Sequence, residues 1–278
     1  MDRRAFLAAV AAAPYALPRG LRSSVVARDS LGDIGLQLYT VRQAMATSVE
    51  RTLMAVAAIG YEEVEFAGYF NRPPRAIKQL LDRNGLKSPS GHVAIDVLRS
   101  GWYRRLSEAS EIGHKWLVVP SLPESDRNSL DAVKRTAELL NRSASDAKTY
   151  KIRLGFHNHD VEFTEVEGRR ILDVLLEETD PELVDFEMDL YWITKAGADP
   201  FDYFRRFPGR FPLVHVKDSA GPPAHQMTEV GKGTIDFKRL FAARRQAGMR
   251  HFFVEHDNPA DPMASVGTSF RYLDSLEF

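Results

Sequence analysis

The sequence predicts an α/β protein that folds as a single (β/α)8 barrel, and three observations support this prediction. Short apolar segments alternate eight times with segments of helical periodicity after residue 33. The 278 residues, 44% of them hydrophobic, suit one large domain with a sizeable core. Four apolar segments in the second half turn polar only at their ends, as strands at the rim of a parallel barrel do. A doubly wound open sheet is less favoured, because no glycine-rich phosphate loop follows the first strand.

The first four strand–helix pairs are predicted in the N-terminal half of the barrel. Residues 33–41 are expected to form the first strand, and residues 49–59 a helix that ends at Gly60. The next three pairs of strand and helix are expected at 63–66 with 73–84, 86–93 with 102–112, and 116–119 with 130–150. Each helix ends near a glycine, an asparagine or a basic turn, which are common stop signals.

The second half of the chain supplies four further pairs. They are expected at 153–158 with 170–178, 184–188 with 201–207, 213–216 with 237–247, and 252–255 with 265–276. No linker between these elements is long enough to separate two domains. We therefore expect residues 31–278 to form one barrel domain.

The N-terminal residues 1–30 are predicted to be an export signal and a disordered lead-in. Arg3 and Arg4 precede an apolar stretch that runs to Ala16, which is the pattern of a twin-arginine signal. The alternative is a disordered N-terminal helix with a chance arginine pair. The apolar stretch is too short to be a stable membrane anchor. The expected location of the mature protein is therefore periplasmic or secreted.

The composition restricts the kinds of ligand and metal site. Lys and Arg total 37 against 38 Asp and Glu, and the pI is near 6.7, so nothing favours nucleic acid or an anionic membrane as partner. The chain has no cysteine, which excludes disulfides, thiolate nucleophiles and zinc–thiolate sites. Any metal is expected to be held by nitrogen and oxygen atoms, and small neutral ligands remain open.

Ionisable side chains stand at the ends of consecutive strands in the second half. Asp189, His215 and Glu255 each follow an apolar run, and strand ends around a barrel mouth converge. Carboxylate and imidazole groups are ligands for Mn²⁺, Co²⁺, Mg²⁺ and Zn²⁺. The fifth strand offers His157 or Glu162 as a further ligand; if Glu162 is the ligand, His157 is a candidate to bind substrate. Taken singly, each residue is also interpretable as a helix cap or a solvated loop residue.

Glu162 and Glu255 are the candidate acid–base pair, because two carboxylates on opposite sides of a bound sugar exchange a proton when one acts as acid and the other as base. A nearby metal would polarise a carbonyl and stabilise an enediolate. Lys217 points the same way as His215 on an ideal strand and is a candidate to hold a substrate oxygen. Alternatively, Lys217 is a lysine at the barrel rim that pairs with a carboxylate. Four neighbours are expected to have supporting or surface roles: Glu187, Asp218, His256 and Asp257.

Three further side chains are weaker candidates for substrate contact. Gly91 lets the backbone turn so that His92 faces the mouth, and Glu65 at the second strand end reaches toward a hydroxyl. Trp192 would supply an apolar wall. Each has an equally simple structural interpretation, as a buried hydrogen-bonding group or as part of the core.

Several motifs together resemble the sugar phosphate isomerase/epimerase group of the xylose isomerase-like TIM barrel superfamily. The likeness covers about residues 33–278 and is carried by residues 35–42, 157–163, 215–218 and 231–237, by Asp189 with Trp192, and by Glu255. The resemblance implies a divalent metal held by Glu, Asp, His and Glu from strands five to eight, with the two glutamates exchanging the substrate proton. The last three ligands correspond to Asp189, His215 and Glu255, whereas the first falls on His157 or Glu162.

The function expected from these observations is a divalent-metal-dependent isomerase or epimerase that acts on a sugar or ketosugar by proton transfer next to a carbonyl. Predicted export favours an unphosphorylated substrate, because sugar phosphates are mainly cytoplasmic. A lyase or hydratase acting on a 3-ketoglycoside is the nearest alternative, since it also requires enolate stabilisation. An exported sugar-binding protein without turnover is an alternative from another class. A homo-oligomer is compatible with each of these functions.

Overall fold

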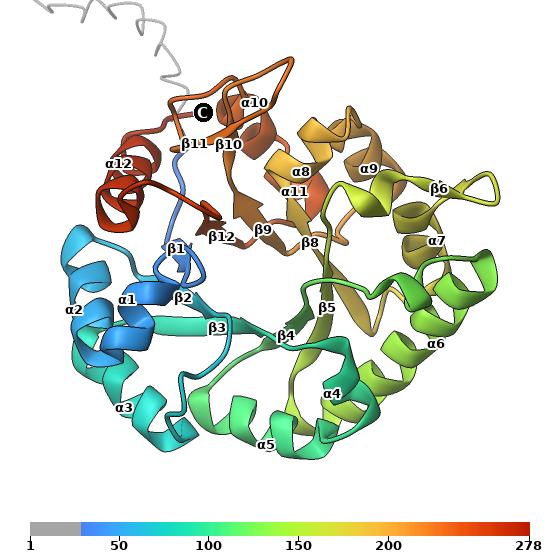
Figure 1. The fold of residues 1–278 in the computed structure, drawn as a ribbon, viewed down its shortest axis with the longest axis horizontal. Helices are drawn as coiled ribbons and strands as arrows, with labels where there is room; N and C mark the ends of the chain where they lie inside the picture. The colour runs from blue at the N-terminus through green and yellow to red at the C-terminus, as the bar shows by residue number, and fades with distance from the viewer. Residues whose placement is uncertain (1–28) are drawn as a thin grey trace, which may run out of the picture.

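The structure, a computed structural model, describes residues 29–278; the predicted export signal at Arg3 and Arg4 lies outside them. Eight parallel strands close into a barrel surrounded by helices (Figure 1). The strand order around the barrel is β1-β12-β9-β8-β5-β4-β3-β2, so each barrel strand pairs with the barrel strands before and after it in the chain. The predicted (β/α)8 TIM barrel is therefore confirmed. Within residues 29–278, no helix is both long enough and apolar enough to span a bilayer.

The barrel strands lie close to the predicted segments. They are β1 Ile34–Gln37, β2 Glu63–Phe66, β3 Lys87–His92, β4 Trp116–Val119, β5 Arg153–His157, β8 Val184–Asp189, β9 Leu213–Val216 and β12 His251–Val254. The first strand is shorter than predicted, because the chain turns after Gln37. The Gln37 side chain accepts a hydrogen bond from the Tyr39 amide, and the backbone carbonyl of Gln37 accepts one from the Thr40 amide.

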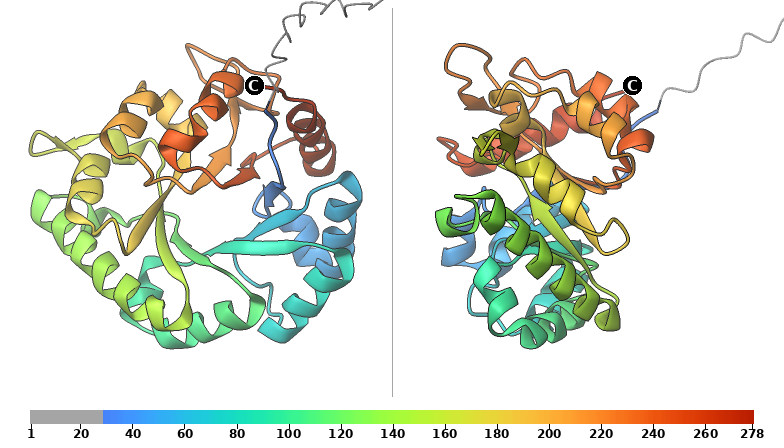
Figure 2. Two further views of the ribbon diagram at one scale, coloured as in Figure 1. Left: turned by 180° about the vertical axis from the view of Figure 1, so that it is seen from behind. Right: turned by 90° about the vertical axis from the view of Figure 1, so that its right-hand side faces the viewer.

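Helices cover the outside of the barrel, as the view from behind and the edge view show (Figure 2). They are α1 Arg42–Thr47, α2 Val49–Ile59, α3 Pro74–Asn84, α4 Ile95–Arg99, α5 Trp102–Ile112, α6 Leu130–Ala147, α7 Ile171–Glu178, α8 Leu190–Lys195, α9 Pro200–Arg206, α10 Phe237–Ala242, α11 Arg244–Ala247 and α12 Pro262–Asp274. The predicted helices 49–59 and 102–112 are confirmed. The predicted helix 237–247 is divided into α10 and α11.

Short elements that the periodicity did not predict occupy the loops after several strands. They are the helices α1, α4 and α8 and two hairpins, β6 Glu165–Val166 with β7 Arg169–Arg170 and β10 Asp218–Ser219 with β11 Met227–Thr228. Three of them lie directly after a barrel strand: α8 follows β8, α4 follows β3, and the β10–β11 hairpin follows β9. They therefore shape the mouth of the barrel rather than its wall.

Side chains alternate between the two faces of each strand, which separates two apolar regions. Val214 and Val254 belong to the large core between the strands and the helices. Leu213 and Phe253, one residue earlier on the same strands, belong with Trp116 and Val118 to a separate apolar cluster. We call this second cluster the interior layer. It fills the barrel beneath the inward-facing polar side chains.

Gly35 leaves space for the Phe253 ring in the interior layer. A methyl group at Gly35 would overlap that ring and press on the backbone oxygen of Phe252. We predict that Gly35→Ala lowers the free energy of unfolding by about 1–3 kcal/mol, because an overpacked core must shift. Gly32→Ala is the control, since a methyl group there has no neighbour within 4 Å. Chemical denaturation of both variants measures the difference, and equal stabilities would contradict the tight fit.

Candidate active site

Inward-facing polar side chains form a connected, buried network above the interior layer. The groups come from strands on opposite sides of the barrel: Glu65 on β2, His92 on β3, His157 on β5, Glu187 on β8 and His215 on β9. All of them except His92 are almost completely buried. Buried ionised groups are stable only when opposite charges and hydrogen bonds surround them. The contacts within the network supply both.

Glu65 is held by hydrogen bonds on both of its oxygens. Its Oε2 accepts from Gln37 Nε2 at 2.7 Å and lies 2.7 Å from His215 Nε2, while Oε1 accepts from Ser90 Oγ at 2.6 Å. Burial raises the pKa of Glu65, but His92 and His215 outweigh burial and hold that pKa below its usual range. The sequence suggested that Glu65 reaches a substrate hydroxyl. The structure instead places it behind His215, without exposed surface and outside the lining of the cavity.

Glu187 lies at the centre of three imidazole rings. Its Oε2 is 3.0 Å from His92 Nε2, 3.1 Å from His157 Nδ1 and 3.1 Å from His215 Nε2. Burial and Glu65 raise the pKa of Glu187, yet the surrounding imidazoles, His215 first, lower it to about 2. These four residues also form one of two groups whose ligand atoms lie within 4.8 Å of one another. Sequence reasoning gave Glu187 only a supporting or surface role.

Strand alternation was the signal that would have placed Glu187 inside the barrel. It stands two residues before Asp189 on the same strand, so both side chains face the barrel interior. Gln37 and Ser90 were missed for a different reason. Their role depends on Glu65, a partner on another strand, and the spacing of residues along the chain does not contain that contact.

Asp189, His215 and Glu255 form the second group of possible metal ligands, as the sequence predicted. Asp189 Oδ1 caps α8 by accepting hydrogen bonds from the Tyr191 and Trp192 amides, which leaves Oδ2 for another partner. His215 Nδ1 lies 2.8 Å from Glu255 Oε2 and 4.0 Å from Asp189 Oδ2. Burial raises the pKa of Asp189 to about 6, although Lys217 and His215 oppose that rise.

Two atoms of this second group are buried without a hydrogen-bond partner among the described residues. They are Asp189 Oδ2 and His215 Nδ1. Asp189 Oδ2 does lie 3.1 Å from Lys217 Nζ, and His215 Nδ1 is near Glu255, but neither contact has the geometry of a hydrogen bond. Buried atoms in that condition point to a missing ligand. A nitrogen and a carboxylate oxygen are suitable donors for a divalent cation.

Lys217 follows the last residue of β9, and its ammonium group contacts three carboxylates. Its Nζ lies 2.7 Å from Glu255 Oε2, 2.9 Å from Asp257 Oδ1 and 3.1 Å from Asp189 Oδ2. Burial lowers the pKa of Lys217, but Asp189 and Glu255 raise it above its usual range. Burial likewise raises the pKa of Glu255, and the cations Lys217 and His215 hold it below its usual range. The sequence offered two interpretations of Lys217: a rim lysine paired with a carboxylate, and a group that holds a substrate oxygen. The structure is compatible with both, since Lys217 pairs with carboxylates and also lines the cavity.

Glu162 lies outside both groups of possible ligands. Its Oε2 accepts a hydrogen bond from the His159 amide at 2.8 Å, and its Oε1 is buried without a partner among the described residues. Burial raises the pKa of Glu162. Of the two strand-five candidates, His157 is the one that the structure brings to the network, with Nε2 3.7 Å from Asp189 Oδ2. The predicted metal contact of Glu162 is therefore absent from these two groups of described residues.

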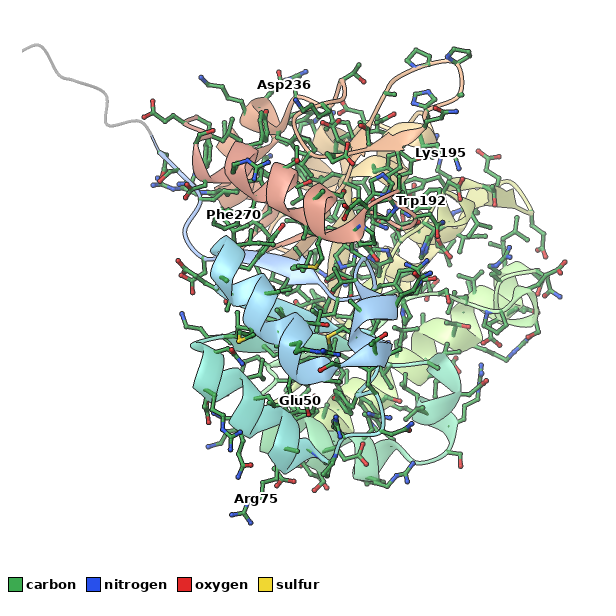
Figure 3. The ribbon with its side chains drawn as sticks, turned by 60° about the vertical axis from the view of Figure 1, so that its left-hand side comes forward. Glu50, Arg75, Trp192, Lys195, Asp236 and Phe270 are labelled. Carbon is green, nitrogen blue, oxygen red and sulfur yellow. The ribbon has the colours of Figure 1, made fainter. Side chains whose placement is uncertain are left out.

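Trp192 borders the network at the first turn of α8. The centre of its ring lies 5.3 Å from that of the His159 ring and 5.7 Å from Lys217 Nζ, and Lys195 Nζ lies 4.3 Å from it. Figure 3 labels Trp192 and Lys195 close to each other in the upper part of the molecule. Trp192 is half-buried and does not belong to the cavity lining, so it packs beside the charged groups instead of forming the predicted wall.

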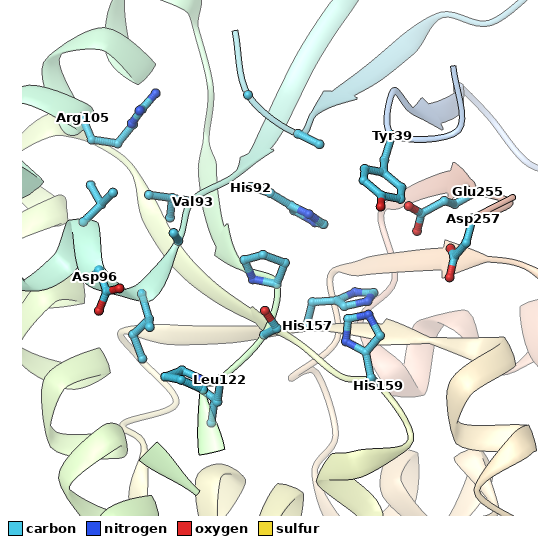
Figure 4. Close-up of a pocket in the computed structure, with 18 of the residues that line it drawn as sticks. Tyr39, His92, Val93, Asp96, Arg105, Leu122, His157, His159, Glu255 and Asp257 are labelled. Atoms are coloured by element: carbon cyan, nitrogen blue, oxygen red, sulfur yellow. The ribbon is translucent and has the colours of Figure 1, made fainter. Parts of the chain in front are cut away.

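A cavity of about 830 Å³ opens onto the network at the mouth of the barrel (Figure 4). Of the predicted site residues, His92, His157, Lys217 and Glu255 line it, together with His159. Burial lowers the pKa of His92, but Glu65 and Glu187 reverse this effect and raise it to about 9. Burial, aided by Lys217, lowers the pKa of His159 to about 4. Burial also lowers the pKa of His157. Of the three imidazoles that line the cavity, His92 is therefore the one favoured as protonated at neutral pH, a combination suited to acid–base chemistry.

Known proteins resemble this chain in sequence and in fold. The sequence profile of the family described as xylose isomerase-like TIM barrel matches residues 53–276. The chain is 23% identical over 266 residues to an inosose dehydratase of Lacticaseibacillus casei, with 81% of this chain and 89% of that protein covered. A sugar phosphate isomerase/epimerase structure from Parabacteroides distasonis superposes with a TM-score of 0.79 and 27% identity, over 88% of this chain and 98% of that one.

A third likeness concerns the fold alone. The structure of the IolI protein with a bound zinc atom has a TM-score of 0.71 at 12% identity, over 86% of this chain and 96% of that one. The family profile, in contrast, spans most of the chain, including all strands from β2 to β12. This protein therefore belongs to the xylose isomerase-like TIM barrel family.

Proposed function

We propose that this protein is a divalent-metal-dependent enzyme that moves a proton at the carbon next to the carbonyl of a sugar or ketosugar, as an isomerase or epimerase does. One observation carries the proposal. Asp189 Oδ2 and His215 Nδ1 are buried without hydrogen-bond partners among the described residues and lie close to Glu255, which lines the cavity. Two unpartnered ligand atoms beside an ionised carboxylate are the arrangement expected of a metal site that keeps one coordination position open for substrate.

The residues present fit a divalent cation. Asp189, His215 and Glu255 supply one imidazole nitrogen and two carboxylate oxygens, a set that suits Mn²⁺, Co²⁺, Mg²⁺ or Zn²⁺. Bound there, the cation would polarise the carbonyl and stabilise the negative charge that develops on its oxygen. The zinc atom in the similarly folded IolI protein is compatible with this ligand chemistry.

Glu255 and His92 are the groups placed to move protons at the cavity. Glu255 lines the cavity and is ionised, so its carboxylate is the proposed base. Protonated His92 lines the same cavity and is the proposed proton donor. Glu162, the other carboxylate proposed from the sequence, has an unpartnered Oε1 but does not line the cavity. Lys217 orients Glu255 through their 2.7 Å contact and presents its ammonium group to substrate oxygens.

A dehydratase is the second candidate function, favoured by the relatives of similar sequence, which are named inosose dehydratase. Removal of a proton next to a carbonyl is the first step of both reactions. The two reactions differ in their second step, since an isomerase or epimerase returns a proton and a dehydratase expels a hydroxyl group two carbons from the carbonyl. In a dehydratase, His92 would donate its proton to the departing hydroxyl.

We also propose that the protein acts outside the cytoplasm. Arg3 and Arg4 before an apolar stretch support export by the twin-arginine route, which transports folded proteins. An enzyme folded before export would carry its metal with it. Acting outside the cytoplasm, it would meet sugars without phosphate groups.

Metal content tests the proposed site directly. We predict about one equivalent of divalent metal in the wild type and at least a tenfold weaker affinity in Asp189→Asn and His215→Gln, since each variant removes one ligand. His251→Gln is the matched control, because His251 is also an inward-facing histidine paired with a glutamate, Glu63, away from the site. Elemental mass spectrometry and calorimetric titration measure these values. A metal-free wild type after incubation with all four ions would favour the sugar-binding alternative.

Glu65→Gln tests whether the carboxylate behind His215 fixes the imidazole. Glu65 Oε2 contacts His215 Nε2. This contact orients the His215 ring so that its Nδ1 faces Asp189 and Glu255. Loss of such a partner typically weakens metal binding by about 10–100-fold. Glu63→Gln, on the same strand and paired with His251, is the control and should bind metal as the wild type does. Calorimetric titration of both variants tests the role, and equal affinities would refute it.

Turnover in heavy water separates the two candidate reactions. We predict that the metal-loaded enzyme incorporates one deuterium into a ketosugar and that Glu255→Gln slows this exchange by about 10²–10⁴-fold, as loss of a general base does. Glu165→Gln, on the exposed β6 strand, is the control. Mass spectrometry of the product detects either deuterium incorporation or loss of water. Loss of water with every ketosugar tested would select the dehydratase.

A further inference from the structure

We propose that the substrate has two parts: a sugar ring at the charged end of the cavity and a bulky apolar substituent, as in an aryl or alkyl glycoside, at the other end. The inference rests on the proposed function, because it places the reacting sugar beside Glu255 and the metal ligands. It adds the class of substrate, which neither the ligand set nor the relatives' names specify for this chain.

The size of the cavity exceeds the needs of a single sugar ring. Its volume is about 830 Å³. Pockets of about 300–1,000 Å³ enclose drug-sized ligands, which are much larger than one pyranose. A monosaccharide bound beside Glu255 would leave most of the cavity to water. A second group of the ligand therefore has room to bind.

The lining of the cavity divides into two chemically different ends. The charged end consists of His92, His157, His159, Lys217, Glu255 and Asp257. The other end contains the polar residues Asp96, Arg105 and Ser121 beside six apolar residues, which we call the apolar wall: Ala94, Ile95, Val97, Pro120, Leu122 and Pro123. Figure 4 shows Leu122 across the cavity from Glu255 and Asp257. The two ends match a ligand with a polyhydroxylated part and an apolar part.

The apolar wall comes from two loops that are fixed to each other. It follows β3 and β4, whereas most of the charged end follows β5, β9 and β12. The Val93 amide donates to the Val118 carbonyl at 2.8 Å, which anchors the start of the first loop. Arg99 joins the loops through Asp96 at 2.6 Å and Asp126 at 2.5 Å. The contact of Arg99 with Asp126 and the Val93–Val118 hydrogen bond thus join the two loops that form the wall.

Several side chains of the apolar wall face solvent. Ala94 and Pro123 are exposed, and Val97 and Pro120 are half-buried. Exposed apolar side chains that adjoin a cavity with charged groups are characteristic of ligand sites. Burying this surface against an apolar substituent would contribute to binding through the hydrophobic effect.

The cavity does not offer a comparable site for a sugar phosphate. Among the described residues that line it, the long cationic side chains are Lys217 and Arg105. Lys217 already contacts three carboxylates, and Arg105 Nη1 lies 3.2 Å from Glu108 Oε2, while Arg105 Nε has no hydrogen-bond partner among the described residues. Asp96 adds a negative charge beside the apolar wall. Phosphate recognition requires cations whose charge is available to it.

Binding of matched sugars to the metal-loaded full chain tests the proposal. Phenyl and methyl glucosides of both anomers, together with glucose 6-phosphate, are titrated by calorimetry against wild type, Ala94→Asp and Ala242→Asp. Ala94 is the N-cap of α4 and has no capping side chain, so aspartate there is compatible with the helix. Ala242 is exposed on α10 and outside the cavity lining, and it serves as the control.

The expected result is that a phenyl glucoside binds wild type and Ala242→Asp at least about tenfold more tightly than its methyl counterpart, as burial of a ring predicts. Ala94→Asp should lose that preference while its metal content is unchanged. Equal binding of the phenyl and methyl sugars, an undiminished preference in Ala94→Asp, tightest binding of glucose 6-phosphate, or no sugar binding would each overturn the two-part substrate. Metal content of the same samples shows separately whether the proposed metalloenzyme fails, since a loaded protein without the preference refutes only the substrate class.

Discussion

Compensation of buried charge inside the barrel is the constraint on which the site depends. Glu65 and Glu187 have no exposed surface, and both contact His215 Nε2. An isolated buried carboxylate would be strongly destabilising, whereas a carboxylate surrounded by imidazolium and hydrogen-bond donors is tolerated. Each group is therefore stable only in the presence of the others. The network forms as a unit, and replacing one member leaves a buried charge without its partner.

Hydrogen bonding is complete around Glu65 but incomplete elsewhere in the network, where Glu187 Oε1 and atoms nearer the barrel mouth have no partner among the described residues. Gln37, Ser90 and His215 satisfy Glu65, but Asp189 Oδ2 and His215 Nδ1 remain without hydrogen bonds. Lys217 supplies positive charge near these atoms without satisfying their geometry. A divalent cation would complete the arrangement at the point where the network meets the cavity. The same contacts that stabilise the interior thus direct the unsatisfied atoms toward a ligand.

The fold and part of the site could be predicted because they depend on local pattern. Apolar runs and helical spacing indicated the barrel, and strand ends indicated Asp189, His215 and Glu255. The first strand ended early because the Gln37 side chain accepts from the Tyr39 amide, a contact that hydrophobic pattern does not reveal. Strand alternation places Glu187 inside the barrel, but it does not reveal the imidazole partners of Glu187, because they come from three other strands.

The division of the barrel mouth separates recognition from chemistry. Strands β5, β8, β9 and β12 direct ionisable groups to one end, while the loops after β3 and β4 present apolar side chains to the other. Contacts with a part of the substrate that does not react still help catalysis, because their binding energy holds the reacting carbon in place. His92, at the end of β3, stands at the junction of the two ends and contacts both Glu65 and Glu187. A ligand that fills the apolar wall would therefore also lie against His92, the proposed proton donor, which would couple substrate recognition to the proposed proton transfer.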